Sequence, residues 1–297
     1  MTEAEFVAAL RSLPLHPAAR GLLDDTAVLG AQVLTLDTLV EGVHFLPADP
    51  PGDVAWKLMA VNLSDLAAKG AVPTGALLSF PLGDDGWDRA FLAGLGKACA
   101  AFACPLLGGD TVRPPRGTPR VLTLTALGAS ATAPSRSGAW AGDALWVTGT
   151  IGDAGPGLAI ARGSDGPSEL LGRYRRPAPR LTEGQALAPI VHAMCDVSDG
   201  LLIDAARMAA ASDLAVTVDL DTTPLSAAYR AHAGADRAAR LAAATAGDDY
   251  ELLFALAAGV VPPVPATRVG HFTAGTGLTV TEDGSPMPLP PRLGFEH

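Results

Sequence analysis

Residues 61–73, VNLSDLAAKGAVP, place a carboxylate where the surrounding pattern predicts an apolar side chain. The overlapping residues 53–69 contain few strand formers and predict a helix. Helical spacing puts five residues on one face of this helix: Val54, Leu58, Val61, Asp65 and Ala68. An ionised aspartate on a buried face is costly unless a cation or several hydrogen-bond donors meet it. The alternative is a kinked helix, in which Ser64 or Asp65 caps a second segment that begins at Leu66.

Composition narrows the class of protein. A chain of 297 residues, 48% of them hydrophobic, predicts two domains with sizeable cores. The net charge of −10 argues against nucleic acid or an anionic membrane as a partner. No uncharged apolar run approaches the roughly 20 residues that span a bilayer, and the acidic residues 1–10 do not resemble a signal peptide. Cys99, Cys104 and Cys195 lack CxxC spacing, which favours free thiols in a reducing cytoplasm over disulfides or a zinc site.

Strand and helix patterns are interleaved along the whole chain. Strands are predicted at residues 27–29, 33–37, 76–80, 105–107, 121–127, 144–148, 215–220 and 250–256. Helices are predicted at residues 53–69, 87–103, 154–162 and 201–211, with shorter ones after a capping box that begins at Thr2 and after a cap at Thr182. This interleaving predicts an α/β or α+β fold. The loop of small residues 131–142 predicts a boundary between domains 1–132 and 133–297.

Acidic residues recur at predicted strand ends and turns, beside apolar or small residues. They are Asp24, Asp25, Asp37, Asp65, Asp110, Asp196, Asp199, Asp248 and Asp249. Each one alone is more typical of a turn or a helix cap. If several converge, two carboxylates about 4 Å apart repel by about 4 kcal/mol at an effective dielectric constant of 20, so convergence requires bound cations. Oxygen ligands without His or Cys favour Mg²⁺ or Mn²⁺ over zinc, and Mg²⁺ commonly shares its ligands with substrate phosphates, which indicates a nucleotide.

The expected phosphate contacts follow a less familiar pattern. The chain has neither a GxxxxGK[ST] loop nor a GxGxxG loop. Instead, the Gly-Gly pair ending at Gly109, together with Gly200, is expected to leave backbone N–H groups open to an anion, and Ser198 offers a hydroxyl. Arg136 is either a phosphate clamp or a solvated linker residue. His44 is either a ligand-facing imidazole or a structural histidine, and no arrangement for covalent catalysis stands out.

Eight motifs, in this order along nearly the whole chain, resemble the thiamine-monophosphate kinase family of the aminoimidazole ribonucleotide synthetase-like superfamily. They are LDDTAVL (23–29), LDTLVEGVHF (36–45), VNLSDLAAKGAVP (61–73), GGDT (108–111), SRSGA (135–139), GDALWVTGTIGD (142–153), DVSDGL (196–201) and GDDYELLF (247–254). The VEGVHF and NLSDLAA segments distinguish this family from its relatives.

The resemblance implies ATP-dependent, in-line phosphorylation of thiamine monophosphate to thiamine diphosphate with several Mg²⁺ ions, in a cytoplasmic homodimer. Residues 1–132 would bind ATP and Mg²⁺ and dimerise through their strands, and residues 133–297 would complete the site. The implied metal ligands are Asp25, Thr35, Asp37, Asp65, Asp110, Asp196 and Asp199. The implied ATP contacts are Gly109, Asp110, Arg136 and Ser198, and the implied thiamine-phosphate contacts are His44, Asp248 and Phe295.

The chain departs from the family pattern in the proline-rich residues 261–265, which stand where a helix is usual, at Ala246, where Gly is usual, and at four further positions. Leu23 replaces a usual Gly, Leu36 a Thr, Lys69 a common Met, and Asp248 a Glu that is one methylene longer. Two other functions therefore stay open. One is an ATP-dependent superfamily member that acts on a formyl-amidine or similar small molecule, and the other is a nucleotide-binding protein without turnover.

Overall fold

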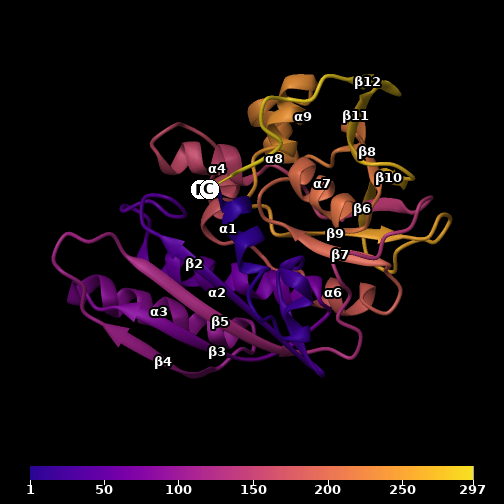
Figure 1. Ribbon diagram of the computed structural model, residues 1–297. Helices are drawn as coiled ribbons and strands as arrows, with labels where there is room; N and C mark the ends of the chain where they lie inside the picture. Colours follow the sequence, from indigo (N-terminus) through magenta and orange to yellow (C-terminus); the bar gives the residue numbers. More distant parts are fainter. Residues whose placement is uncertain (297) are drawn as a thin grey trace.

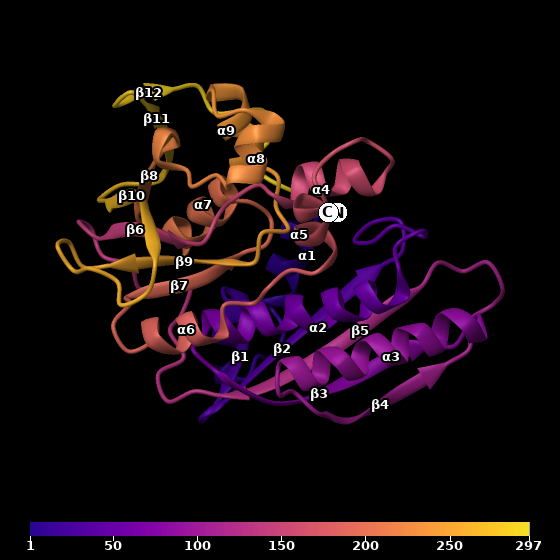
Figure 2. The ribbon, with the colours of Figure 1, turned by 180° about the vertical axis from the view of Figure 1, so that it is seen from behind.

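A five-stranded sheet with two long helices on one face forms the N-terminal half of the protein (Figure 1). The computed structural model describes residues 1–296. The strands stand in the order β1 (Ala27–Leu29), β2 (Gln32–Val40), β5 (Val121–Ala129), β3 (Val72–Pro81) and β4 (Leu106–Val112). Helices α2 (Pro51–Ala68) and α3 (Asp85–Ala101) cover the face seen in Figure 2. The helix α1 (Glu3–Leu10), with the predicted capping box, and the 3-10 helix η1 (Pro17–Leu22) precede the sheet.

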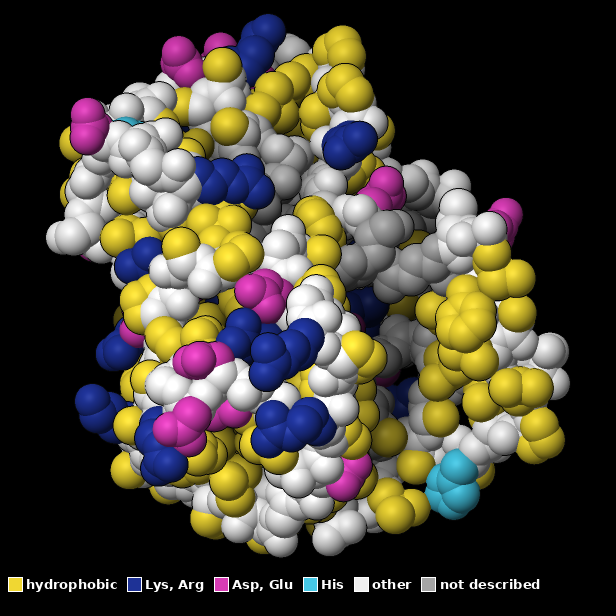
Figure 3. All heavy atoms as spheres, turned by 90° about the vertical axis from the view of Figure 1, so that its left-hand side faces the viewer, with side chains coloured by type: hydrophobic (Ala, Val, Ile, Leu, Met, Phe, Trp, Pro, Cys, Tyr) yellow, Lys and Arg dark blue, Asp and Glu magenta, His cyan; other side chains and the backbone are white. Residues whose placement is uncertain are grey.

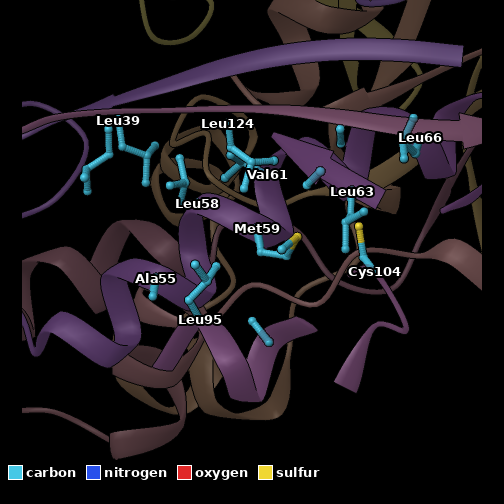
Figure 4. Close-up of a cluster of buried hydrophobic side chains, with 14 of the residues drawn as sticks. Leu39, Ala55, Leu58, Met59, Val61, Leu63, Leu66, Leu95, Cys104 and Leu124 are labelled. Carbon is cyan, nitrogen blue, oxygen red and sulfur yellow. The ribbon is translucent and has the colours of Figure 1, made fainter. Parts of the chain in front are cut away.

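The core of this half follows from two periodicities. Alternate residues of β2 and β5 are buried, as expected of strands with one covered face. Leu39 and Leu124 on the strands pack with Leu58 and Leu63 of α2 and with Leu95 of α3 (Figure 4). All of α2 from residue 57 to residue 68 is buried, because the sheet covers one side of the helix and the C-terminal half covers the other.

Helix α2 is continuous through Ser64 and Asp65. The alternative of a kinked helix with a cap at either residue is therefore wrong. Both side chains instead form hydrogen bonds to strands outside the helix. The helix begins with Pro51 in its first turn, where a missing N–H costs nothing.

A seven-stranded sheet organises the C-terminal half. Its strands stand in the order β12 (Ser285–Met287), β11 (Gly277–Glu282), β8 (Ala215–Asp219), β10 (Ala266–Thr273), β6 (Ala144–Thr148), β9 (Glu251–Leu256) and β7 (Ala193–Val197). Its helices are α4 (Ala154–Ala161), α5 (Ser168–Arg175), α6 (Leu181–Leu187), α7 (Leu201–Ala211), α8 (Ala227–Ala233), α9 (Arg237–Ala244) and the 3-10 helix η2 (Leu220–Thr222). The two mixed halves confirm the predicted α/β class, whereas the boundary at residue 132 stays a prediction.

Ion pairs tie α5 of the C-terminal half to the start of α2. Arg175 Nε lies 3.0 Å from an oxygen of Asp49, and Arg176 Nε lies 2.5 Å from one of Asp53. Figure 3 shows basic and acidic side chains gathered together on one face of the molecule. Among residues 1–296, no helix combines the length and the apolar character that a membrane crossing requires.

Several local predictions were wrong. Residues 108–111 form part of strand β4 instead of a turn. A Cβ on Gly109 would lie 1.9 Å from the carbonyl oxygen of Leu78, so the glycine permits close strand pairing. Thr182 lies inside α6, whose N-cap residue is Arg180. Strands β7 and β10 to β12 and helices α5, α8 and α9 were not predicted, because they are short or interrupted by glycines and a bulge.

Candidate active site

Helix α2 carries the side chains that join the two halves at the site. Asp65 accepts a hydrogen bond from the hydroxyl of Thr35 on β2. The neighbouring Ser64 donates to Asp196 on β7 across 2.5 Å. Two adjacent residues of α2 therefore contact both sheets: Asp65 binds the N-terminal sheet through Thr35, and Ser64 binds the C-terminal sheet through Asp196.

Three of the predicted metal ligands converge. Asp25, Asp65 and Asp196 each offer a carboxylate oxygen, and these oxygens lie within 4.8 Å of one another. They come from the loop before β1, from α2 and from β7. We call these three residues the carboxylate cluster. Asp37 on β2 lies close enough to interact electrostatically with Asp65 and Asp196.

Burial and mutual repulsion disfavour full ionisation of this group. Burial, followed by the charge of Asp25, raises the pKa of Asp196 to about 8, although the hydrogen bond from Ser64 opposes the shift. Burial, with Asp25 and Asp199, raises the pKa of Asp37 to about 6. Burial, followed by the charge of Asp37, holds the pKa of Asp65 well above its usual value. These carboxylates therefore need either protons or bound cations to coexist.

Asp25 has one paired and one unpaired oxygen. Arg136 forms an ion pair with Asp25 Oδ1, and this carboxylate raises the pKa of Arg136 even though burial opposes the charge. Asp25 Oδ2 is buried, and among the described residues it has no hydrogen-bond partner. An orphaned oxygen beside two further carboxylates, with no His or Cys in the cluster, fits Mg²⁺. The residues that would hold the ion are those of the carboxylate cluster.

The DVSDG turn between β7 and α7 is held by a residue that the sequence analysis missed. Asp204 Oδ2 accepts from the backbone N–H groups of Ser198, Asp199 and Gly200, at 3.1–3.2 Å. Burial and Asp199 raise the pKa of Asp204 to about 6. The N–H of Gly200 is therefore engaged within the chain, which corrects the prediction that it lies open to an anion. The available signal was an acidic residue in the first turn of the predicted helix 201–211.

Arg207 supports the same turn from α7. It pairs with Asp199 and lies 3.2 Å from Asp204 Oδ1. The predicted metal ligand Asp199 thus has a basic partner, as Asp25 does.

Two of the predicted thiamine-phosphate contacts, Asp248 and Phe295, are hydrogen-bonded to this turn. The backbone N–H of Asp248 donates to the Ser198 carbonyl oxygen at 2.7 Å, and that of Phe295 donates to the Asp199 carbonyl oxygen at 2.9 Å. Lys57 on α2, which the sequence analysis missed, forms an ion pair with Asp248 at 2.6 Å. Its signal was its place eight residues before Asp65, on the same side of a predicted helix.

Gly109 and Asp110 do not join the cluster of their own chain. The register of the sheet aligns Asp37, Leu124, Leu78 and Gly109 across β2, β5, β3 and β4. Three strand spacings of about 4.8 Å separate β4 from β2 by roughly 14 Å. Asp110 pairs with the exposed Ser79, so its side chain lies on the sheet face opposite α2.

A second buried ion pair connects Asp24 and Lys69. Lys69 Nζ lies 2.5 Å from Asp24 Oδ1 and donates to the Met194 carbonyl oxygen at 3.2 Å. Burial raises the pKa of Asp24, but Lys69 and Arg20 more than offset this effect and hold it below the usual value. Lys69, a departure from the family pattern, thus links α2 to the loop before β1 and to β7.

Replacing Lys69 with methionine is expected to lower the free energy of unfolding by about 2 kcal/mol. Removing one partner of a buried pair costs roughly 3–5 kcal/mol, and Arg20 still compensates part of the charge of Asp24. Thermal unfolding should show a midpoint lower by roughly 4–8 °C. Lys97→Met, at an exposed position of α3, is the control and should not shift the midpoint. An unchanged midpoint in Lys69→Met would contradict the stabilising role of the pair.

Comparisons with known proteins identify the class to which this fold and site belong. The family described as "AIR synthase related protein, N-terminal domain" matches residues 23–130, and "AIR synthase related protein, C-terminal domain" matches residues 141–283. The thiamine-monophosphate kinase of Caulobacter vibrioides is 39% identical over 95% of this chain and 86% of its own length. The enzyme of that name from Escherichia coli K12 is 37% identical over 93% and 91%.

Solved structures match the fold of this chain over nearly its whole length. The structure of AaThiL complexed with AMPPCP and TMP covers 100% of this chain and 97% of its own, with a TM-score of 0.86 and 28% identity. The thiamine-monophosphate kinase of Stenotrophomonas maltophilia K279a covers 95% and 96%, with a TM-score of 0.77 and 36% identity. The hydrogenase maturation protein HypE, at 20% identity and a TM-score of 0.71, shares the fold alone. The chain belongs to the thiamine-monophosphate kinase family within the AIR synthase related proteins.

Proposed function

We propose that this protein uses ATP to phosphorylate thiamine monophosphate, giving thiamine diphosphate, the last step of thiamine diphosphate biosynthesis. The observation that carries the proposal is the carboxylate cluster, in which three distant segments bring oxygens within 4.8 Å and one buried oxygen stays unpaired. The relatives named thiamine-monophosphate kinase support it, as does the structural match to AaThiL complexed with AMPPCP and TMP.

The residues of the carboxylate cluster and Arg136 would act on the phosphates of ATP. Asp25, Asp65 and Asp196 would hold Mg²⁺, which when bound neutralises charge on the phosphates. Arg136, which is next to the cluster, supplies a fixed positive charge on the ATP side. The acceptor is already an anionic phosphate, so it needs little help from a general base. Positioning and charge neutralisation therefore account for most of the rate.

Incubation with ATP, Mg²⁺ and thiamine monophosphate, followed by chromatography, tests the function. Thiamine diphosphate should form, and omission of thiamine monophosphate or addition of EDTA should prevent it. Stabilisation by nucleotide without product under any divalent ion would favour a binding protein. Turnover of a formyl-amidine instead would favour another superfamily activity.

We also infer a homodimer that buries the open face of the N-terminal sheet, in the cytoplasm, where the free cysteines stay reduced. Leu36 and Leu77, which are 60% and 41% exposed, flank Thr125 on this face, and Val121, four residues away on β5, is 47% exposed. Apolar strand residues exposed together favour an interaction surface. Asp110 lies on the same face, where a second copy would approach it.

Replacing both Leu36 and Leu77 with glutamate is expected to give a monomer, because a symmetric interface would bury each new charge twice. Analytical ultracentrifugation at micromolar concentration should show a dimer for the unmodified protein and a monomer for the variant. Leu92→Glu on the exposed surface of α3 is the control and should stay dimeric. A monomeric unmodified protein would contradict the dimer.

A further inference from the structure

We propose that Lys57 is a positioning residue that holds Asp248 and His44 in place and thereby governs binding of the thiamine part of the acceptor. This inference rests on the proposed function and on the family resemblance, which implies that both residues contact thiamine phosphate. Neither the sequence motifs nor the composition singled out Lys57.

The ammonium group of Lys57 contacts both Asp248 and His44. Lys57 Nζ lies 2.6 Å from Asp248 Oδ2 and donates to the backbone carbonyl oxygen of His44 at 3.1 Å. It also lies 4.3 Å from the centre of the Tyr174 ring. Lys57 is only 2% exposed, and a buried ammonium needs such partners. The lysine therefore connects the loop after β2 in one half with the turn before β9 in the other.

Asp248 is fixed at both oxygens and still reachable by a ligand. Its Oδ1 accepts from the Tyr250 hydroxyl at 2.9 Å, while Lys57 holds Oδ2. Its backbone has φ 62°, a conformation that side-chain-bearing residues rarely adopt. The side chain is nevertheless 35% exposed. Each partner of the ion pair lines a different small hollow: Lys57 and Tyr174 line one, and Asp248 and Asp249 line the other.

Helix geometry separates this ion pair from the carboxylate cluster. Lys57 and Asp65 are eight residues apart on the same side of α2, which corresponds to about 12 Å along the axis. In this proposal the end of α2 that carries Asp65 lies near the phosphates, and the end that carries Lys57 lies near the thiamine part of the acceptor. A substitution at Lys57 should accordingly weaken binding of thiamine monophosphate and leave binding of ATP unchanged.

Replacement of Lys57 with methionine, which fills similar space without charge, tests the proposal. We expect the KM for thiamine monophosphate to rise at least tenfold, with the KM for ATP within twofold of the unmodified protein. Lys57→Arg should recover most of the loss, because it restores a cation. Lys97→Met is the matched control and should change neither constant. Thermal unfolding verifies that each variant folds.

A double-mutant cycle tests whether Lys57 acts through Asp248. If it does, Lys57→Met should add less than twofold to the effect of Asp248→Asn on the KM for thiamine monophosphate. Independent effects that multiply, an unchanged KM for thiamine monophosphate, or equal rises in both KM values would each overturn the proposal. Calorimetric measurement of thiamine monophosphate binding distinguishes a failure of the proposed function from a failure of the role of Lys57. Absence of turnover and of binding in the unmodified protein contradicts the proposed function, whereas equal binding by unmodified protein and Lys57→Met contradicts only the role of Lys57.

Discussion

Replacing Asp65 with asparagine is expected to cut the turnover of thiamine monophosphate at least about 100-fold while raising the melting temperature of the metal-free protein. Turnover should fall because the carboxylate cluster loses one of the three charges that would hold the cation, and preorganised charge of this kind typically contributes two or more orders of magnitude. Stability rises because Asp65 interacts unfavourably with Asp25, Asp37 and Asp196. An asparagine retains an oxygen for the Thr35 hydroxyl and offers N–H donors to these neighbours.

The measurement pairs steady-state kinetics with thermal unfolding in EDTA at pH 8.5, above the pKa of about 6 of Asp37 and the pKa of about 8 of Asp196. Each kcal/mol of relieved repulsion should raise the melting temperature by roughly 2–4 °C. Asp85→Asn, at an exposed position of α3, is the control and should alter neither quantity. Near-normal turnover in Asp65→Asn would remove the cluster from the mechanism, and a lower melting temperature would contradict repulsion within it.

The metal-free protein is expected to lose stability as pH rises from about 4 to about 8, and Mg²⁺ is expected to remove this loss. The unfolded chain releases the protons of Asp37 and Asp196 near pH 3.8, whereas the folded protein retains them until about pH 6 and about pH 8. Between these values the folded state binds more protons than the unfolded state, so the free energy of unfolding falls with rising pH. Bound cations replace the protons and remove the cost of ionisation.

Melting curves at pH 5.5, 7 and 8.5, with EDTA or with Mg²⁺, measure this dependence. A loss of at least about 1 kcal/mol in EDTA would lower the midpoint by roughly 2–4 °C. Asp196→Asn should give a flatter profile in EDTA, because it removes the group with the pKa of about 8. Equal slopes in EDTA for Asp196→Asn and the unmodified protein would contradict the raised pKa of Asp196. Curves that Mg²⁺ does not change would show that the cluster does not bind this cation.

Much of the fold could be predicted from sequence because the signals are local. Alternation of apolar residues in β2 and β5 and helical spacing in α2 are set by covalent geometry and by burial of one face. The family resemblance implied seven metal ligands, and the structure brings the carboxylates of Asp25, Asp65 and Asp196 from that set together. The pattern of acidic residues beside apolar segments indicated that such carboxylates would need cations if they converged, because isolated buried carboxylates are costly.

Other features depend on partners that no local pattern specifies. The partner of Lys57 is 191 residues away and that of Lys69 is 45 residues away, so helical periodicity could not connect them. The prediction for Gly200 was wrong because Asp204 occupies its N–H group. Asp110 belongs to a motif in the sequence, yet the register of β4 places it across the sheet from Asp37.

The sequence by itself determined the residue types of the site, its preference for a hard cation, the α/β class and the likeness to one kinase family. Only the tertiary structure decided which carboxylates lie together, which have basic partners, and that one helix carries residues of both the carboxylate cluster and the ion pair of Lys57. The reason is physical. Residue chemistry and periodicity act over a few positions, whereas electrostatic coupling between buried groups depends on distances that exist only once both sheets pack against α2.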